Sequence, residues 1–356
     1  MGMPPAAPLQ PHRRRAVGLA ARLLALPLLG GFGVRAVAAT PAAASASSPR
    51  PPVLDDEQVR RWFARIHVAA RELNYQGTLV SSADGVLSSA RVAHFTEGGE
   101  SYERVEVLDG RMQRTYRHDD QVTTLWPAKR VAVIERRDPR TTALRTVLDP
   151  RARGSYRVQE QGQAMVAGRE AVVLLLRPQD ELRFTQRLWV DAGTALVLRT
   201  DVLGPQQQVL ESSAFSEVQI GVRPQPQTVL QPMHRLDGWR QVRPQPTATR
   251  LEAEGWALRA PVPGFELTGC ARRLLDPADG ADGASVLQAV FSDGLTHVSL
   301  FIEPRDGHGR RAPIQGHSGA TYTLMQPHGD AWWVTAVGDV PPAALQQFVQ
   351  ALQRRP

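Results

Sequence analysis

The sequence predicts an α+β protein that is mostly antiparallel β, with a curved, barrel-like sheet around a helix and a smaller second α+β domain. Three observations lead to this prediction. One amphipathic helix stands at the start of the folded part, a long series of alternating apolar runs follows it, and a Pro- and Gln-rich stretch separates these runs from a second set of hairpins.

The helix is expected over "LDDEQVRRWFARIHVAARELN". Val59, Phe63, Ile66 and Ala70 recur there at helical spacing, and Asp55 or Asp56 can cap the first turn. A single amphipathic helix of this kind needs a sheet to cover its apolar face.

The sheet begins directly after the helix. "YQGTLVSS" and "VLSSARVAHF" flank "ADG", and "SYERVEVL" and "RMQRTYR" flank "DG", both of which are hairpin signals. Further runs continue to "VLESSAFSEVQI", which gives a meander of about ten strands. A sheet of that length must curl, split or close.

A boundary follows this meander. Residues 223–254 are rich in Pro and Gln and predict an extended linker with polyproline character. We therefore expect a first domain over 54–222 and a small α+β domain over 255–356, which ends in the helix "PPAALQQFVQAL".

The first 39 residues resemble a secretory signal peptide, with Arg13 to Arg15 before a mostly apolar stretch. "AVAA" and "AAASA" are the two candidate cleavage sites. A transmembrane anchor is the alternative, although Arg22 and Pro27 interrupt the apolar run. Residues 40–53 are a low-complexity segment that we expect to be disordered.

The charge of the chain does not indicate a nucleic-acid-binding protein. The formal net charge is +7, but five of the 42 basic residues lie in the first 39 residues, which contain no acidic residue. The remaining basic residues nearly balance the 35 acidic ones, so no nucleic-acid partner is expected.

No catalytic residue, metal ligand or cofactor site is predicted, and the chain is not expected to be an enzyme. "GHSGA" approaches a nucleophile elbow around Ser318, but strands flank it on both sides. "DPADGADG" (276–283) could bind calcium, but a solvated acidic loop is the preferred interpretation. The single cysteine, Cys270, cannot form an internal disulfide.

Two long stretches resemble the RseB/MucB family of periplasmic sigma-E regulatory proteins. In the first domain these are "LNYQGTLVSSADGVLSSARVAHFTEGGESYERVEVLDG" and "RLWVDAGTALVLRTDVLGPQQQVLESSAFSEVQIG". In the second domain the segments "PVPGFEL", "FSDGLTHVSLFIEP" and "WWVTAVGDVPPAALQQFVQAL" resemble the family as well. The resemblance covers about residues 54 to 353. The family pattern after the first hairpin is met by His94, Gly98, Glu103, Arg104, Leu108, Asp109 and Gly110.

The resemblance implies a first domain like the lipoprotein carriers, an unclosed barrel over helices with an apolar cavity. It implies a periplasmic negative regulator that binds the periplasmic domain of a transmembrane anti-sigma factor and protects it from proteolysis. Lipopolysaccharide or the acyl chains of a lipid or lipoprotein would release it. The alternative is a periplasmic lipid or lipoprotein carrier that uses the same cavity, and a homodimer is left open.

The candidate binding residues lie on the predicted strands and at their ends. The cavity candidates could equally be ordinary core, and the arginines could be ordinary solvated surface. Guanidinium groups would suit an acidic peptide or lipid phosphates. The cavity candidates are Leu79, Phe95, Val107, Leu125 and Val133, and the partner-binding candidates are Trp126, Lys129, Arg130, Arg136, Arg137 and Arg140.

Overall fold

The structure is a computed structural model that describes residues 52–110, 112–137, 149–274, 285–305 and 312–355. The signal-peptide prediction for 1–39, most of the segment 40–53, Arg140 and the acidic stretch 276–283 lie outside these ranges. None of the helices in the described ranges is long and apolar enough to cross a membrane.

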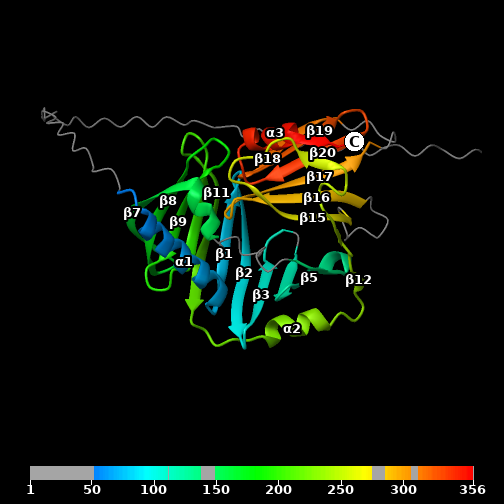
Figure 1. Cartoon of the computed structure of the whole chain (residues 1–356). Coiled ribbons are helices and arrows are strands. Elements are labelled where there is room, and N and C mark those ends of the chain that lie inside the picture. Colours follow the sequence, from blue (N-terminus) through cyan, green and yellow to red (C-terminus); the bar gives the residue numbers. More distant parts are fainter. Residues whose placement is uncertain (1–51, 111, 138–148, 275–284, 306–311, 356) are drawn as a thin grey trace, which may run out of the picture. The chain divides into compact units, whose positions relative to one another are not determined.

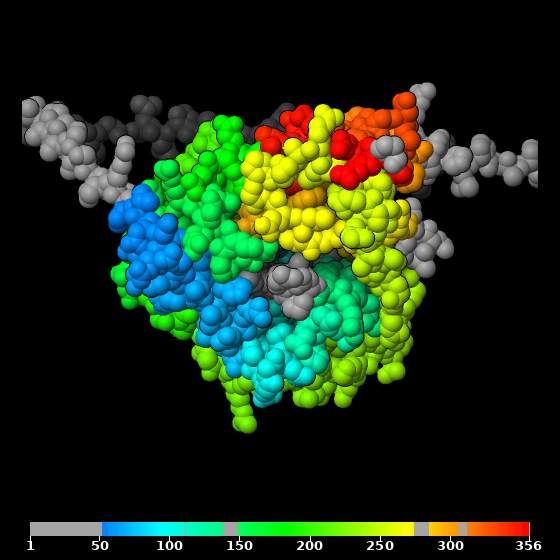
Figure 2. Space-filling view, viewed as in Figure 1, coloured from blue at the N-terminus to red at the C-terminus, as the bar shows by residue number. Residues whose placement is uncertain are grey.

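Helix α1 (Asp56–Glu72) forms where the apolar spacing predicted it. Asp55 accepts a hydrogen bond from the Gln58 N–H at 2.8 Å, and the Gln58 side chain accepts one from the Asp55 N–H at 2.9 Å. This capping box satisfies two of the otherwise unpaired amides of the first turn. The helix buries Phe63 and Ile66 against strands of the same domain and leaves its other face exposed (Figures 1 and 2).

The first domain contains one open sheet of 12 strands with the order β12-β6-β5-β4-β3-β2-β1-β11-β10-β9-β8-β7. The chain pairs β1 with β11, so the meander runs outward from this central pair to two different edges (Figure 1). The strands are β1 (Tyr75–Ala83), β2 (Val86–Glu97), β3 (Glu100–Val107), β4 (Arg114–His118), β5 (Gln121–Trp126), β6 (Val131–Arg136), β7 (Tyr156–Val166), β8 (Arg169–Pro178), β9 (Thr185–Asp191), β10 (Val197–Leu203), β11 (Val209–Ile220) and β12 (Arg240–Val242).

The segment predicted as an extended linker contains regular structure. Helix α2 (Gln227–His234) buries Val229 and Met233, and β12 pairs in parallel with β6. The difference arises because the apolar positions "VLxxM" at helical spacing find an exposed apolar sheet face to cover. Local composition alone could not reveal that face.

Helices α1 and α2 cover opposite faces of the sheet. The His94 ring Nδ1 lies 2.8 Å from the Leu73 carbonyl at the end of α1, whereas its neighbour Phe95 packs in the cluster that contains Val229 and Met233 of α2. Successive residues of a strand point to opposite faces. We call these the α1 face and the α2 face.

The turn after β9 is held by a buried carboxylate. Asp191 is 2% exposed, accepts from Arg169 Nε at 2.7 Å, and accepts from the Thr194 N–H and hydroxyl at 2.8 and 2.7 Å. Burial by itself would raise the pKa of this carboxyl. The hydrogen bonds from Arg169 and Thr194 outweigh burial and hold the pKa of Asp191 below its ordinary value.

The second domain contains a seven-stranded sheet of order β13-β15-β16-β17-β20-β19-β18 and the terminal helix α3 (Pro342–Ala351). Helix α3 buries Leu345, Phe348 and Val349 in the core of this sheet. With the open sheet of the first domain, this arrangement confirms the predicted fold class. The strands of this sheet are β13 (Thr247–Ala248), β15 (Glu266–Leu274), β16 (Ser285–Ser292), β17 (His297–Pro304), β18 (Ile314–Ser318), β19 (Thr321–His328) and β20 (Trp332–Gly338). Strands β14 (Trp256–Leu258) and β21 (Leu352–Arg354) form a separate antiparallel pair.

Candidate functional site

A cavity of about 690 Å³ lies on the α1 face of the first sheet and is bounded on its other side by the second domain. Its volume falls in the range of small-molecule sites, roughly 300–1,000 Å³. Side chains of both domains line it, so it depends on the contact between them.

The wall that the first domain contributes is mainly apolar. Tyr75, Leu79, Leu198 and Phe215 line it, and the Tyr75 and Phe215 rings meet edge to face with centroids 6.1 Å apart. Burial, followed by the nearby charge of Glu103, raises the pKa of the Tyr75 hydroxyl far above its ordinary value. This wall therefore carries no titrating tyrosine at neutral pH and suits an acyl chain or an apolar peptide side chain.

The opposite wall is more polar and belongs to the second domain. It includes the tip of the β16–β17 hairpin and the start of β17. Arg137, at the end of β6 in the first domain, also lines the cavity and pairs with Glu135 through Nε at 2.8 Å. An amphiphile would find both apolar and polar surfaces here. The second-domain residues of this wall are Thr268, Val290, Ser292, Gly294, Leu295, Thr296, His297, Ala320 and Asp339.

The five predicted cavity residues do not lie together. Leu79 lines the cavity, and Val107 is the register partner of Ala90, which also lines it. Phe95 and Leu125 point to the α2 face and pack with α2 in a closed core. Val133 packs in a small separate cluster.

The separation of these residues has a simple cause. Alternation in a strand gives two faces but does not say which face a helix covers. The sequence pattern does not predict α2. The apolar strand residues that α2 covers, Phe95 and Leu125, are therefore expected from the sequence to be available to a ligand. The cavity residues Leu198 and Phe215 were missed because their place depends on the pairing of β1 with β11.

The partner-binding candidates divide between the two ends of the β5–β6 hairpin. Trp126 is half-buried against Val131 and Val133, and Lys129 and Arg130 are exposed in the connecting turn. Arg136 and Arg137 lie at the far end of β6, about 17 Å away at 3.3 Å per residue. The described candidates therefore form two groups rather than one patch, and Arg140 lies outside the described residues.

Arg136 and Arg137 each have an acidic neighbour. Arg136 Nη1 lies 3.5 Å from Asp120, and its side chain is 85% exposed. An exposed pair of this kind contributes little to stability, so Arg136 can change partner at low cost.

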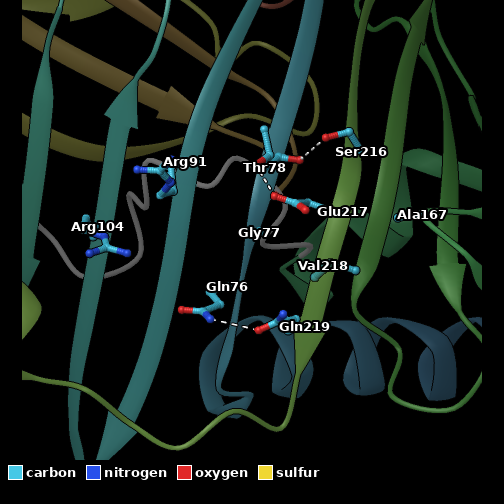
Figure 3. A pocket seen from close by; sticks show the side chains of 10 residues that line it. All are labelled: Gln76, Gly77, Thr78, Arg91, Arg104, Ala167, Ser216, Glu217, Val218 and Gln219. Carbon is cyan, nitrogen blue, oxygen red and sulfur yellow. Dashed lines mark hydrogen bonds between the residues drawn. The ribbon is translucent and has the colours of Figure 1, made fainter.

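A second pocket of about 450 Å³ lies on the α2 face, across β3, β2, β1 and β11 (Figure 3). Its walls are polar: Gln76 donates to Gln219 at 3.0 Å, and the Thr78 hydroxyl donates to Glu217 at 2.8 Å. Arg91 and Arg104 border the same pocket (Figure 3). Its side chains suit a polar group rather than an acyl chain.

The backbone around Ser318 differs from that of a nucleophile elbow. Ser318 ends β18, and the turn that follows leads into the antiparallel strand β19, where Thr321 is its register partner. A nucleophile elbow requires a strand-to-helix turn, which this position does not provide.

The fold brings one histidine close to two carboxylates. His118 Nε2 lies 3.4 Å from Glu100 and 3.9 Å from Asp119. Glu100 already accepts from the Tyr102 hydroxyl, and Asp119 accepts from the Ser101 N–H at 2.9 Å. Both carboxylates therefore already have hydrogen-bond partners where the start of β3 lies beside the end of β4.

The MucB/RseB N-terminal domain matches residues 58–233, and the MucB/RseB C-terminal domain matches residues 250–353. The sigma factor AlgU regulatory protein MucB of Pseudomonas aeruginosa is 28% identical over 312 residues, which is 83% of this chain and 90% of the relative. The sigma-E factor regulatory protein RseB of Haemophilus influenzae is 21% identical over 81% of this chain and 88% of its own length.

A crystal structure of MucB in complex with MucA(peri) is similar to this chain at a TM-score of 0.63. It is 25% identical, and the match covers 83% of this chain and 98% of that one. The two domain models follow one another in family order and together account for most of the chain. The chain therefore belongs to the MucB/RseB family of sigma-E regulatory proteins.

Proposed function

We propose that this chain is a periplasmic negative regulator that binds the periplasmic domain of a membrane-spanning anti-sigma factor. The observation that carries the proposal is the match of both domains, over most of their length, to a MucB structure solved together with MucA(peri). Bound in this way, the chain would shield the anti-sigma factor from proteolysis. Such a role needs binding and no turnover.

The cavity supports the second part of the proposal, which is release by lipopolysaccharide or another lipid. Its apolar wall on β1, β10 and β11 and its polar wall on the second domain suit an amphiphile. A lipid releases the partner only if it binds the partner-free conformation more tightly, and only by that difference in affinity. A lipid preference of 100-fold would thus weaken partner binding by at most 100-fold.

Two groups of side chains are proposed to contact the partner. Lys129 and Arg130 lie in the exposed turn of the β5–β6 hairpin beside the half-buried Trp126, and Arg136 and Arg137 lie at the other end of β6. The arginines would pair with acidic side chains of the partner. Arg137 also lines the cavity, so it could respond to both ligands.

A periplasmic carrier of lipids or lipoproteins remains the second candidate, because the apolar cavity alone would serve it. A carrier would have no use for the polar wall that the second domain adds. Partner binding, rather than lipid binding, therefore distinguishes the regulator from the carrier.

The experiment is calorimetric titration of the mature protein with the purified periplasmic domain of the anti-sigma factor, with and without lipopolysaccharide. Binding that weakens as lipopolysaccharide is added supports the proposal. Tight lipid binding without partner binding would favour the carrier. Sedimentation of the same preparation would report whether the protein is a homodimer.

The matched variants are Arg136→Ala and Arg177→Ala. Arg136 is a proposed contact at the end of β6, whereas Arg177 is an exposed arginine of β8 that pairs with Gln159 at 3.2 Å. Only the first variant is expected to weaken partner binding, by about fivefold or more, with a reduced dependence on salt.

A further inference from the structure

The tip of the β16–β17 hairpin, Ser292–Thr296, inserts from the second domain into the first. The Asp149 N–H donates to the Gly294 carbonyl at 3.0 Å. Gly294 has a φ of 97°, and a Cβ on it would lie 3.0 Å from the Ala152 nitrogen. Both the backbone conformation and the close approach therefore require glycine at this position. Leu295 of the tip packs against the core of the first domain.

Asp293, in the same tip, makes the central contact. Its Oδ2 accepts from Arg183 Nε at 2.5 Å and from the Tyr156 hydroxyl at 3.2 Å. Its Oδ1 accepts from the N–H groups of Leu295 and Thr296, each at 2.8 Å. One carboxylate thus shapes the hairpin tip and holds the first domain.

Arg183 is equally enclosed. Its other nitrogens donate to Asp180 at 2.5 Å and to the Pro263 carbonyl at 3.0 Å, and its guanidinium lies 4.3 Å from the Phe265 ring centroid. The side chains of Arg183 and Asp293 both have an exposed fraction of 0%. Loss of Arg183 would leave Asp293 as a buried charge without its partner, and loss of Asp293 would leave Arg183 with Asp180 as its remaining carboxylate. Either change should destabilise the contact between the domains.

Two other ion pairs between the domains are longer and less enclosed. Arg151 pairs with Glu266 at 3.3 Å with side chains 43% and 74% exposed, and Arg273, 32% exposed, lies 3.8 Å from Glu135, which is 9% exposed. Exposed pairs contribute little to stability. Arg183–Asp293 is therefore the charged contact whose loss should matter most among the described residues.

The same hairpin tip is a wall of the cavity. Ser292, Gly294, Leu295 and Thr296 line it, on either side of Asp293 in the chain. A ligand too large for about 690 Å³ must displace this wall, because the opposite wall is the hydrogen-bonded sheet. Displacement of the tip would draw the Asp293 carboxylate away from Arg183.

We propose that the Arg183–Asp293 pair is a latch between the two domains, and that a lipid in the cavity opens it by displacing the hairpin tip. The lipid step rests on the proposed function, whereas the latch itself does not. Opening would change the surface that both domains present to the partner. Lipid binding in the cavity would in this way change the affinity of the protein for its partner.

The test uses hydrogen exchange read by mass spectrometry on the full mature chain, with lipopolysaccharide as the probe. In the wild-type protein, lipopolysaccharide should raise the exchange of the Ser292–Thr296 tip and of the Asp149 amide together, by about tenfold. The variant Asp293→Asn should show this raised exchange without lipopolysaccharide. X-ray scattering of the lipid-free variant should give a radius of gyration several ångströms above the about 19 Å of a compact chain of roughly 300 residues.

Asp180→Asn is the matched control, because it removes a carboxylate from Arg183 without touching the second domain. It should exchange and scatter like the wild type. The double variant Arg183→Leu/Asp293→Leu removes both charges at once and leaves neither as an unpaired buried charge, so without lipopolysaccharide it should remain closed. This double variant tests the latch even where Asp293→Asn folds poorly.

An Asp293→Asn protein that is folded, compact and unchanged in exchange overturns the latch. Wild-type exchange at the tip that does not rise with bound lipopolysaccharide overturns the lipid step. If instead the proposed function is wrong, the result is different. Asp293→Asn would still open, but the anti-sigma domain would not bind to the wild-type protein.

Discussion

Replacement of Phe63 by alanine removes the largest of the side chains that α1 buries. Phe63 is 1% exposed and packs among apolar side chains of β7 to β9. Truncation of a buried Phe to Ala costs about 3–5 kcal/mol, from lost transfer free energy and the cavity that remains. The higher helix propensity of alanine returns only about 0.5 kcal/mol. We therefore expect the free energy of unfolding to fall by about 3–4 kcal/mol.

The assay is urea unfolding followed by circular dichroism, with the melting temperature as a second measure. A loss of this size corresponds to about 6–16 °C for a domain of 150–250 residues. Val68→Ala is the control, because Val68 lies on the same helix but is 48% exposed, and it should change stability by no more than about 0.5 kcal/mol. A loss below about 1 kcal/mol for Phe63→Ala would refute the docking of α1 on this sheet. Because Ala70 of α1 also lines the cavity, an undocked helix should change the binding of a fluorescent fatty acid as well.

Three further predictions concern single positions. Because the folded-state pKa of Asp191 lies below its ordinary value, the stability that its charge contributes is full above about pH 4 and is lost as the pH falls through the lowered pKa. Asp191→Asn should therefore cost about 2 kcal/mol at pH 7 and progressively less at acidic pH, measured by urea unfolding over a pH series. Ala90→Trp should fill part of the cavity and weaken the binding of a fluorescent fatty acid at least tenfold, and unchanged affinity would place the ligand elsewhere. Gly77→Ala should lower the melting temperature, because its Cβ would lie 2.3 Å from the Glu217 carbonyl, at a typical cost of about 1–3 kcal/mol; Gly316→Ala, where a Cβ meets open space, is the control.

Local patterns in the sequence predicted most of the helices, strands and turns, and they identified the family. The helix predicted from Asp55 to Asn74 ends within two residues of α1, because the capping box and the apolar spacing are both local signals. The turns "ADG" and "SDG" connect β1 to β2 and β16 to β17, where glycine takes positive φ values of 77° at Gly85 and 97° at Gly294. These features need no knowledge of distant residues.

Local patterns could not predict which residues line the candidate site. Leu79 and Phe95 have the same local signature, an apolar residue in an alternating strand, yet Leu79 lines the cavity and Phe95 lies under α2. The difference is made by a helix about 130 residues further along the chain. Asp293 similarly satisfies a turn requirement in the sequence, and the ion pair with Arg183 becomes visible only in the fold.

Outside residues 223–254, the sequence by itself thus determined most of the helices, strands and turns, and it identified the family to which the chain belongs. The tertiary structure decided which sheet face each helix covers, that β1 pairs with β11, and that Arg183 meets Asp293. The physical reason is that propensity, capping and alternation act over a few residues. Burial and buried charge pairing depend instead on contacts between residues more than 100 positions apart, which no local pattern records.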